Sequence, residues 1–179
     1  MQEKMKNNLF EDSAETVAKE LLGKYLCRKL PSGDIIRLRI METEAYPAED
    51  TACYGYGYEG NHGDKPKTPA NAPLFEAGGT CCIYGGMILI VCGKTGQPDN
   101  VLIRAAVGEE EYYDGPCKVA DALQVDKKFH GMDLTNRSEL WIEENPDHKN
   151  YIELKRKGLG KTATEEDKMR KLRFIVAVL

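Results

Sequence analysis

Apolar and polar residues alternate along residues 35–44, and this period of two predicts a β-strand. Counting by twos from Ile36 places two acids, Glu42 and Glu44, on the apolar face of that strand. The opposite face carries Arg37, Arg39, Met41 and Thr43. If the strand continues through this stretch, carboxylates enter a face that the preceding residues direct toward the core.

The same kind of pattern predicts two helices and several further strands. The stretch EDSAETVAKELLGKYL, residues 11–26, predicts an opening helix with Asp12 as its N-cap and Gly23 as its stop. Residues 114–125 predict a short helix that begins at Asp114 and Pro116. Apolar runs predict strands at residues 25–30, 80–93, 101–107, 138–143 and 171–179.

Glycine and proline mark the irregular parts of the chain. Gly85 and Gly86 interrupt the apolar run of residues 80–93, which indicates a bulge or a close backbone approach. Residues 47–79 are rich in both residue types and predict a long loop, which in a compact domain is usually functional or disordered.

Strand-rich halves with scattered helices favour an α+β fold over a parallel α/β fold. The length of 179 residues and the apolar content of 41% suit one globular domain over residues 1–179, with residues 1–10 as a flexible N-terminus. We find no apolar stretch near the ~20 residues of a membrane span and no secretory signal, so we expect a cytoplasmic protein with no membrane partner.

Cysteine and charge patterns narrow the chemistry. The six cysteines show no C-x-x-C pair, and the three histidines form no ligand cluster with them, so we expect reduced core thiols and no metal site. The net charge of −4 argues mildly against nucleic acid, but residues 149–173 are basic. That stretch is either a solvated face or a local surface for an anionic partner.

Two interpretations of the acids stay open at this point. Arg104 lies at the centre of the predicted strand 101–107 and is the candidate partner of a buried carboxylate. The acids either form a structural Glu–Arg pair between neighbouring strands, or one of them lies at the mouth of a cleft as a general base for water. Spacing alone does not choose between them.

Several motifs, in one order along the chain, resemble the methylpurine (3-methyladenine) DNA glycosylase family of the alkyladenine type. METEAY followed by EDTA resembles the family signature, and KTPANAPLF, GGTCCIYGGM and VLIRAAV resemble its loop, tyrosine-rich strand and arginine strand. GPCKVADAL resembles its Gly-Pro-x-Lys-Leu helix, and KGLGKTATEEDKMRKLRFIV its closing loop and strand. The similarity spans residues 12–178.

The resemblance implies a single domain with a mostly antiparallel curved sheet flanked by helices. It implies an enzyme that flips a damaged purine out of double-stranded DNA and hydrolyses its N-glycosidic bond without a cofactor or metal. Glu44 would be the catalytic carboxylate, assisted by Arg104, while Glu42 would be structural. Tyr46 and Tyr84 match the aromatic residues that hold the flipped base, although each is otherwise an ordinary core tyrosine. We expect a monomer that is cytoplasmic and associated with the nucleoid.

Three positions depart from the family pattern within its substrate site. Cys53 stands where the family commonly has a histidine. The change to cysteine keeps the backbone N–H of this position but removes the ring, which Tyr54 could replace. Met87 takes the place of the wedge residue in an ungapped reading, although a shifted register would make Tyr84 and Gly85 the wedge. Lys94 takes the place of the pocket asparagine, where it could favour neutral lesions or reach a phosphate.

Contacts to the DNA backbone are expected from the basic stretch. The candidates are Lys155, Arg156, Lys157 and Lys161, with Arg39 and Lys118 as further ones. Ala70 stands where relatives often have a basic residue, which predicts weaker DNA affinity.

Two other functions stay open: a non-catalytic protein that binds DNA lesions, and a hydrolase or binding module for nucleosides or RNA.

Overall fold

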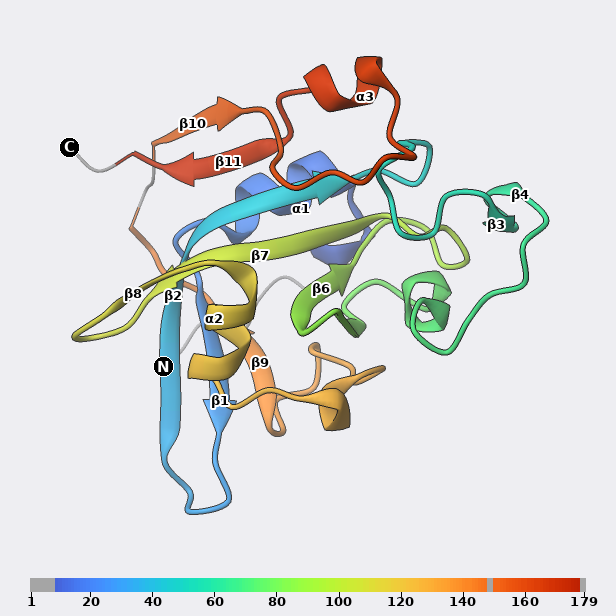
Figure 1. Ribbon diagram of the computed structural model, residues 1–179. Coiled ribbons are helices and arrows are strands. Elements are labelled where there is room, and N and C mark those ends of the chain that lie inside the picture. Colours follow the sequence, from blue (N-terminus) through green and yellow to red (C-terminus); the bar gives the residue numbers. More distant parts are fainter. Residues whose placement is uncertain (1–8, 148–149, 178–179) are drawn as a thin grey trace.

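A mostly antiparallel nine-stranded sheet, with helices packed against it, organises the computed structural model, which describes residues 9–147 and 150–177 (Figure 1). The helices are α1 (Ala14–Leu21), α2 (Pro116–Ala122) and α3 (Glu165–Met169), with 3-10 turns η1 (Leu9–Glu11), η2 (Ala72–Phe75) and η3 (Lys127–Phe129). The strands are β1 (Tyr25–Lys29), β2 (Ile35–Tyr46), β3 (Tyr58–Glu59), β4 (His62–Gly63), β5 (Cys81–Tyr84), β6 (Met87–Val91), β7 (Asn100–Val107), β8 (Tyr112–Asp114), β9 (Leu140–Glu143), β10 (Tyr151–Leu154) and β11 (Arg173–Val176).

The sheet runs in the order β10-β11-β2-β7-β6-β5, so the first hairpin and the last strand meet at its centre. β1 pairs with β2 and β9, and β8 pairs with β7. A two-stranded unit of β3 and β4 lies within the loop of residues 47–79. The α+β prediction is confirmed.

Strand β2 changes face at a β-bulge, so the strict alternation predicted for it is wrong. The register to β7 shifts between Ile40 and Glu42 and again between Glu42 and Thr43. Ile40 and Met41 both lie in the core beneath the helices, as does Ala45. Because the bulge adds one residue, Glu42 and Glu44 lie on the sheet face opposite to Ile40. The acids therefore do not enter the apolar face that the pattern of residues 36–40 defines.

Gly85 and Gly86 form the turn of a hairpin between β5 and β6. Tyr84 pairs with Met87 across this two-residue turn, and both glycines have positive φ, 56° and 78°. Two consecutive left-handed residues are what a type I′ hairpin turn requires. The predicted bulge is therefore a chain reversal, and residues 80–93 are two strands rather than one.

The two predicted helices form within residues 11–26 and 114–125, but neither has the expected acid as its N-cap. Ser13, not Asp12, caps α1, because its hydroxyl oxygen accepts a hydrogen bond from the Thr16 N–H at 3.2 Å. Gly115, not Asp114, precedes α2, and Pro116 is its first residue. A proline there has no N–H that would need a partner in the first turn.

Two apolar clusters cover the two faces of the sheet. The larger one packs α1 and α2 against the sheet, with Leu21, Ile103 and Leu123 fully buried. The smaller one lies beneath residues 47–79 on the face of the acids, with Tyr46, Leu74 and Leu102 buried in it. All six cysteines are free, and five of them are buried.

The ends of the chain extend the fold beyond the predicted elements. Phe10 in η1 is buried, so residues 9 and 10 belong to the fold, while residues 1–8 of the predicted flexible N-terminus lie outside the described residues. Residues 155–172, which include α3, run from β10 back to β11 past the end of β2 (Figure 1). None of the helices in the described ranges has the length and apolar character of a membrane span.

Candidate active site

Glu44 lies near the end of β2 with no solvent-exposed area, and three donors reach its carboxylate. Its Oε1 accepts hydrogen bonds from the Tyr46 hydroxyl at 2.8 Å and from Arg104 Nη1 at 3.3 Å. Its Oε2 accepts one from the backbone N–H of Lys157 at 2.7 Å. Strands β2 and β7 thus converge on one buried acid together with the C-terminal segment, which we define as residues 155–172.

Arg104 bridges both acids of the signature. Its Nε lies 3.6 Å from Glu42 Oε1, while its Nη1 binds Glu44. Glu42 also pairs with Arg173 Nη1 at 3.0 Å from β11. The structural Glu–Arg pair between strands therefore exists, and Glu44 differs from Glu42 by its additional hydroxyl and backbone donors.

Three tyrosines form a ladder of rings beside this carboxylate. The Tyr54 ring lies 5.8 Å from the Tyr46 ring and 4.3 Å from the Tyr84 ring, centroid to centroid, with tilts of 33° and 31°. Burial, followed by the charge of Glu44 and the hydrogen bond to it, raises the pKa of Tyr46 well above its ordinary value. The Tyr46 hydroxyl therefore stays protonated and donates a hydrogen bond to Glu44.

The predicted substrate residues Cys53 and Lys94 lie outside the hydrogen-bond network of Glu44. The Cys53 thiol donates to the carbonyl of Pro98 at 3.3 Å, and its backbone N–H donates to the carbonyl of Asp50 at 3.0 Å. Burial raises the pKa of Cys53 to about 12, so it remains a thiol. Lys94 is exposed on the turn between β6 and β7. The structure brings neither side chain to Glu44.

Arg156 is buried rather than exposed, which contradicts its predicted contact with DNA. Its Nη2 pairs with Asp50 Oδ2 at 2.8 Å, and both side chains have no exposed area. Its guanidinium also donates to the carbonyls of Ala45 and Asp167 and lies 5.0 Å from the centroid of the Tyr46 ring. A buried guanidinium needs such partners in place of water. Through them Arg156 fixes the C-terminal segment to Asp50 and to the end of β2.

Asp50, in the EDTA motif, is a structural centre that the sequence did not identify as such. Arg170 Nη1 binds the same Oδ2 at 2.9 Å, and the Ala52 N–H binds Oδ1 at 2.9 Å. Thr51 ties the neighbouring turn to α3, since its N–H and hydroxyl both donate to Asp167 Oδ2, at 2.9 and 2.6 Å. The motif and the C-terminal segment are thus held together around Glu44. No sequence pattern pairs Asp50 with these arginines, which follow it by 106 and 120 positions.

The other residues predicted to contact DNA are exposed or half-buried. Lys155, Lys157 and Lys161 are exposed on the segment that covers Glu44. Met87 is half-buried at the base of the Gly85–Gly86 turn, and the Cys117 thiol at the start of α2 donates to the carbonyl of Gly85 at 3.6 Å. Exposed Lys118 follows Cys117, and Arg39 is half-buried in β2.

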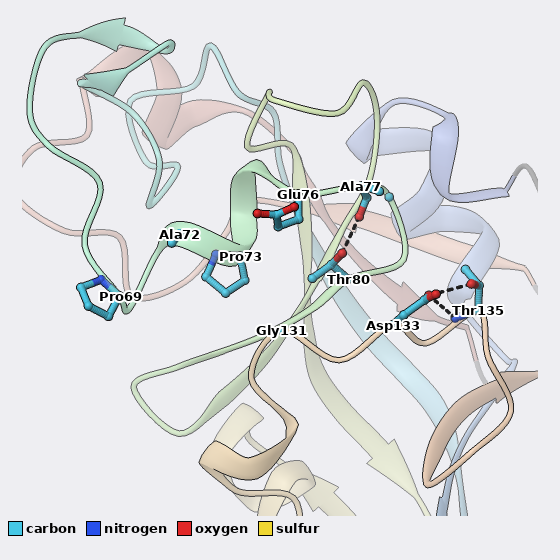
Figure 2. Close-up of a pocket in the computed structure, with 10 residues that line it drawn as sticks. Pro69, Ala72, Pro73, Glu76, Ala77, Thr80, Gly131, Asp133 and Thr135 are labelled. Carbon is cyan, nitrogen blue, oxygen red and sulfur yellow. Dashed lines mark hydrogen bonds between the residues drawn. The ribbon is translucent and has the colours of Figure 1, made fainter.

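A depression of about 680 Å³, whose lining does not include Glu44, lies between residues 69–80 and residues 131–135 (Figure 2). Its lining includes Glu76 from the end of η2 and Asp133, whose Oδ1 accepts hydrogen bonds from Thr135 (Figure 2).

Within residues 9–147 and 150–177, no group of three or more His, Cys, Asp or Glu is placed to hold a metal ion.

Comparison with known proteins agrees with the motifs. The model of the family described as methylpurine-DNA glycosylase matches residues 8–111 and 106–178. A Methanocella arvoryzae protein, whose name assigns it provisionally to the 3-methyladenine DNA glycosylases, is 35% identical over 180 residues, with 88% of this chain and 84% of the relative covered. The DNA-3-methyladenine glycosylase of Homo sapiens is 30% identical over 165 residues, with 76% of this chain and 53% of the human protein covered.

Proposed function

Because the chain belongs to the methylpurine-DNA glycosylase family, and is therefore an N-glycosidic-bond hydrolase acting on DNA, we propose that Glu44 activates the attacking water. The substrate is a damaged purine nucleotide that is flipped out of duplex DNA.

The hydrogen bonds of Glu44 carry the proposal. A carboxylate offers about four lone-pair positions to donors. Among the described residues, two donors reach Oε1 and one reaches Oε2, so one position on Oε2 is left for the proton of a water molecule. The fixed donors hold the carboxylate in place while this position accepts the proton.

The chemistry of the bond explains why an acid is needed there. An N-glycosidic bond breaks through an oxocarbenium-like sugar, as in glycoside hydrolysis. A carboxylate beside that sugar both takes the proton of the attacking water and faces the developing positive charge. Arg104, shared with Glu42, keeps the carboxylate oriented and makes no bond with the sugar in this account.

A flipped nucleotide needs more room than the buried site beside Glu44 has. Glu44 and Tyr46 are buried, and the Tyr54 ring lies directly beside Tyr46. We therefore propose that DNA binding opens the site on the side of the tyrosine rings, while the Lys157 N–H stays bound to Glu44. Met87, at the tip of the β5–β6 hairpin, would fill the gap that the base leaves in the duplex.

The experiment is a base-release assay with duplexes that contain hypoxanthine, ethenoadenine or methyladenine. Release of a free base from at least one duplex, with the DNA backbone left intact, is the expected result. Tight binding to a lesion without release from any duplex would favour a non-catalytic lesion-binding protein. Release only from nucleosides or RNA would overturn the choice of substrate.

A further inference from the structure

We propose that His130 is a positioning residue that holds the β5–β6 hairpin in place for base flipping. It acts through the backbone of Ile83, which lies two residues before the Gly85–Gly86 turn of that hairpin. The inference rests on the proposed function, in which the tip of this hairpin fills the gap that the base leaves. It adds a residue that lies outside both the carboxylate network and the tyrosine rings.

The His130 ring makes two hydrogen bonds, and together they fix its protonation. Its Nδ1 accepts a hydrogen bond from the Ile83 N–H at 3.0 Å, so Nδ1 carries no proton. Its Nε2 lies 2.8 Å from the carbonyl oxygen of Pro69, which can only accept, so Nε2 carries the proton. The ring is therefore neutral, and the Pro69 carbonyl selects the tautomer that presents a lone pair to Ile83.

The imidazole completes the outer edge of β5, which is the last strand in the sheet order. The backbone that follows His130 covers the beginning of this edge. The Cys81 N–H donates to the carbonyl of Met132 at 2.7 Å, and the Gly131 N–H donates to the carbonyl of Cys81 at 2.8 Å. Outward-facing N–H groups recur at every second residue of an antiparallel strand, so the next one is that of Ile83. At this position the Nδ1 lone pair of His130 takes the place of a backbone carbonyl.

The tip of the hairpin is exposed, so its position depends on the contacts at its base. Gly85 and Gly86 are exposed, and Met87 is half-buried. The inner edge of β5 pairs with β6, and the Cys117 thiol, a weak donor, reaches the Gly85 carbonyl at 3.6 Å. A wedge offsets the cost of unstacking a base only if it keeps its place against the duplex. The bond from Ile83 to His130 holds the remaining side of the hairpin.

The same ring ties the hairpin to the loop of residues 47–79. Pro69, which accepts the Nε2 hydrogen bond, belongs to this loop, and the Cys82 thiol of β5 donates to the carbonyl of the next residue, Ala70, at 3.5 Å. Pro69 and Gly131, the residue after His130, both line the depression shown in Figure 2. A displacement of the hairpin therefore has to break contacts with two separate segments of the chain.

The test measures base flipping in full-length protein that does not cleave, with Glu44→Gln as the parent. The probe is an ethenoadenine duplex with 2-aminopurine beside the lesion, whose fluorescence rises when the stack opens. One hydrogen bond changes an equilibrium by about 2- to 12-fold. His130→Leu removes the acceptor for Ile83, so it should lower the flipping equilibrium by such a factor and leave affinity for undamaged duplex unchanged.

His130→Asn separates the two hydrogen bonds of the ring. The Oδ1 atom of asparagine takes the position of Nδ1 and accepts from Ile83, whereas its amide does not extend to Pro69. Flipping by His130→Asn should therefore match the parent. His130→Phe keeps a ring without either bond, and it replaces His130→Leu if that variant does not fold.

Asn145→Ala is the matched control. It removes a side-chain hydrogen bond to a backbone carbonyl, that of Gly23 at 2.9 Å, outside the hairpin and the loop. This variant should flip the base as the parent does. An equal loss in Asn145→Ala would overturn the inference, because lowered stability alone would then explain the effect of His130→Leu.

Two other results would also overturn the inference. One is flipping at the parent level in His130→Leu or His130→Phe. The other is a loss that His130→Asn does not restore, because the role would then not depend on Ile83. Absence of base release by the protein with Glu44 intact would instead overturn the proposed function.

Discussion

Replacement of Arg156 by methionine tests whether this arginine holds the site together or contacts DNA. The side chain has no exposed area, pairs with Asp50 and donates to two backbone carbonyls. Removal of one partner from a buried ion pair costs about 3–5 kcal/mol. Because Asp50 keeps Arg170 at 2.9 Å, we expect the lower end, about 3 kcal/mol. For a chain of this length, that is a fall in melting temperature of roughly 6–12 °C.

The assay is thermal unfolding followed by circular dichroism, together with binding to duplex DNA. Lys157→Met is the matched control, since it removes the same charge at the next residue, where the side chain is exposed. We expect Lys157→Met to melt with the parent protein and to bind DNA more weakly. If Arg156→Met melts with the parent protein and loses DNA affinity as Lys157→Met does, the buried structural role is refuted.

Three further predictions concern DNA binding, pH and packing. Lys157→Gln should lower the slope of log affinity against log salt concentration by about 1, measured by fluorescence anisotropy, and an unchanged slope would exclude a phosphate contact. Burial alone would raise the pKa of the Asp167 carboxyl, but hydrogen bonds from Thr51 and Thr164 lower that pKa below 3.8. The ionised carboxylate therefore stabilises the folded protein fully above that pH, and this stabilisation is lost as the pH falls through the folded-state pKa. Asp167→Asn should therefore lower the melting temperature at pH 7, by an amount that shrinks in acid; a pH-independent difference would contradict this. Gly55→Ala should cost about 1–3 kcal/mol in denaturant unfolding, since its Cβ would overlap the Pro98 ring, and no loss would contradict that overlap.

Local patterns were sufficient for much of the fold. The opening helix, the β1–β2 hairpin and the strand β7 follow from periodicity within short windows, and the structure confirms them. The turn at Gly85 and Gly86 was also available from the sequence, because a Gly-Gly pair between apolar runs is a hairpin signal. The prediction of one strand with a bulge at these glycines is wrong, because the two apolar runs on either side pair with each other as β5 and β6.

The bulge in β2 shows where a periodic argument fails. Counting by twos assumes an unbroken pleat, and one extra residue near Met41 moves every later side chain to the other face. The acids were correctly predicted to be buried, but for the wrong reason. They lie with Arg104 and Arg173 on a second sheet face, which residues 47–79 cover, and not among the aliphatic residues of the first.

The site itself depends on contacts between residues far apart in the chain. Arg156 and Asp50 are separated by 106 positions, and no local pattern shows that one neutralises the other. The same holds for the backbone N–H of Lys157, whose hydrogen bond to Glu44 comes from the path of the chain and not from the lysine side chain. The predicted DNA contact of Arg156 is wrong because the basic run is not uniformly exposed: Arg156 is buried between exposed Lys155 and Lys157.

The most direct test of the account compares Glu44→Gln with Glu42→Gln in the base-release assay. Glutamine keeps the shape of each side chain and cannot take the proton of a water molecule. The account predicts that Glu44→Gln binds lesion DNA and releases base about 10²- to 10⁴-fold more slowly, while Glu42→Gln releases it at the parent rate. Base release by Glu44→Gln at the parent rate would contradict the account.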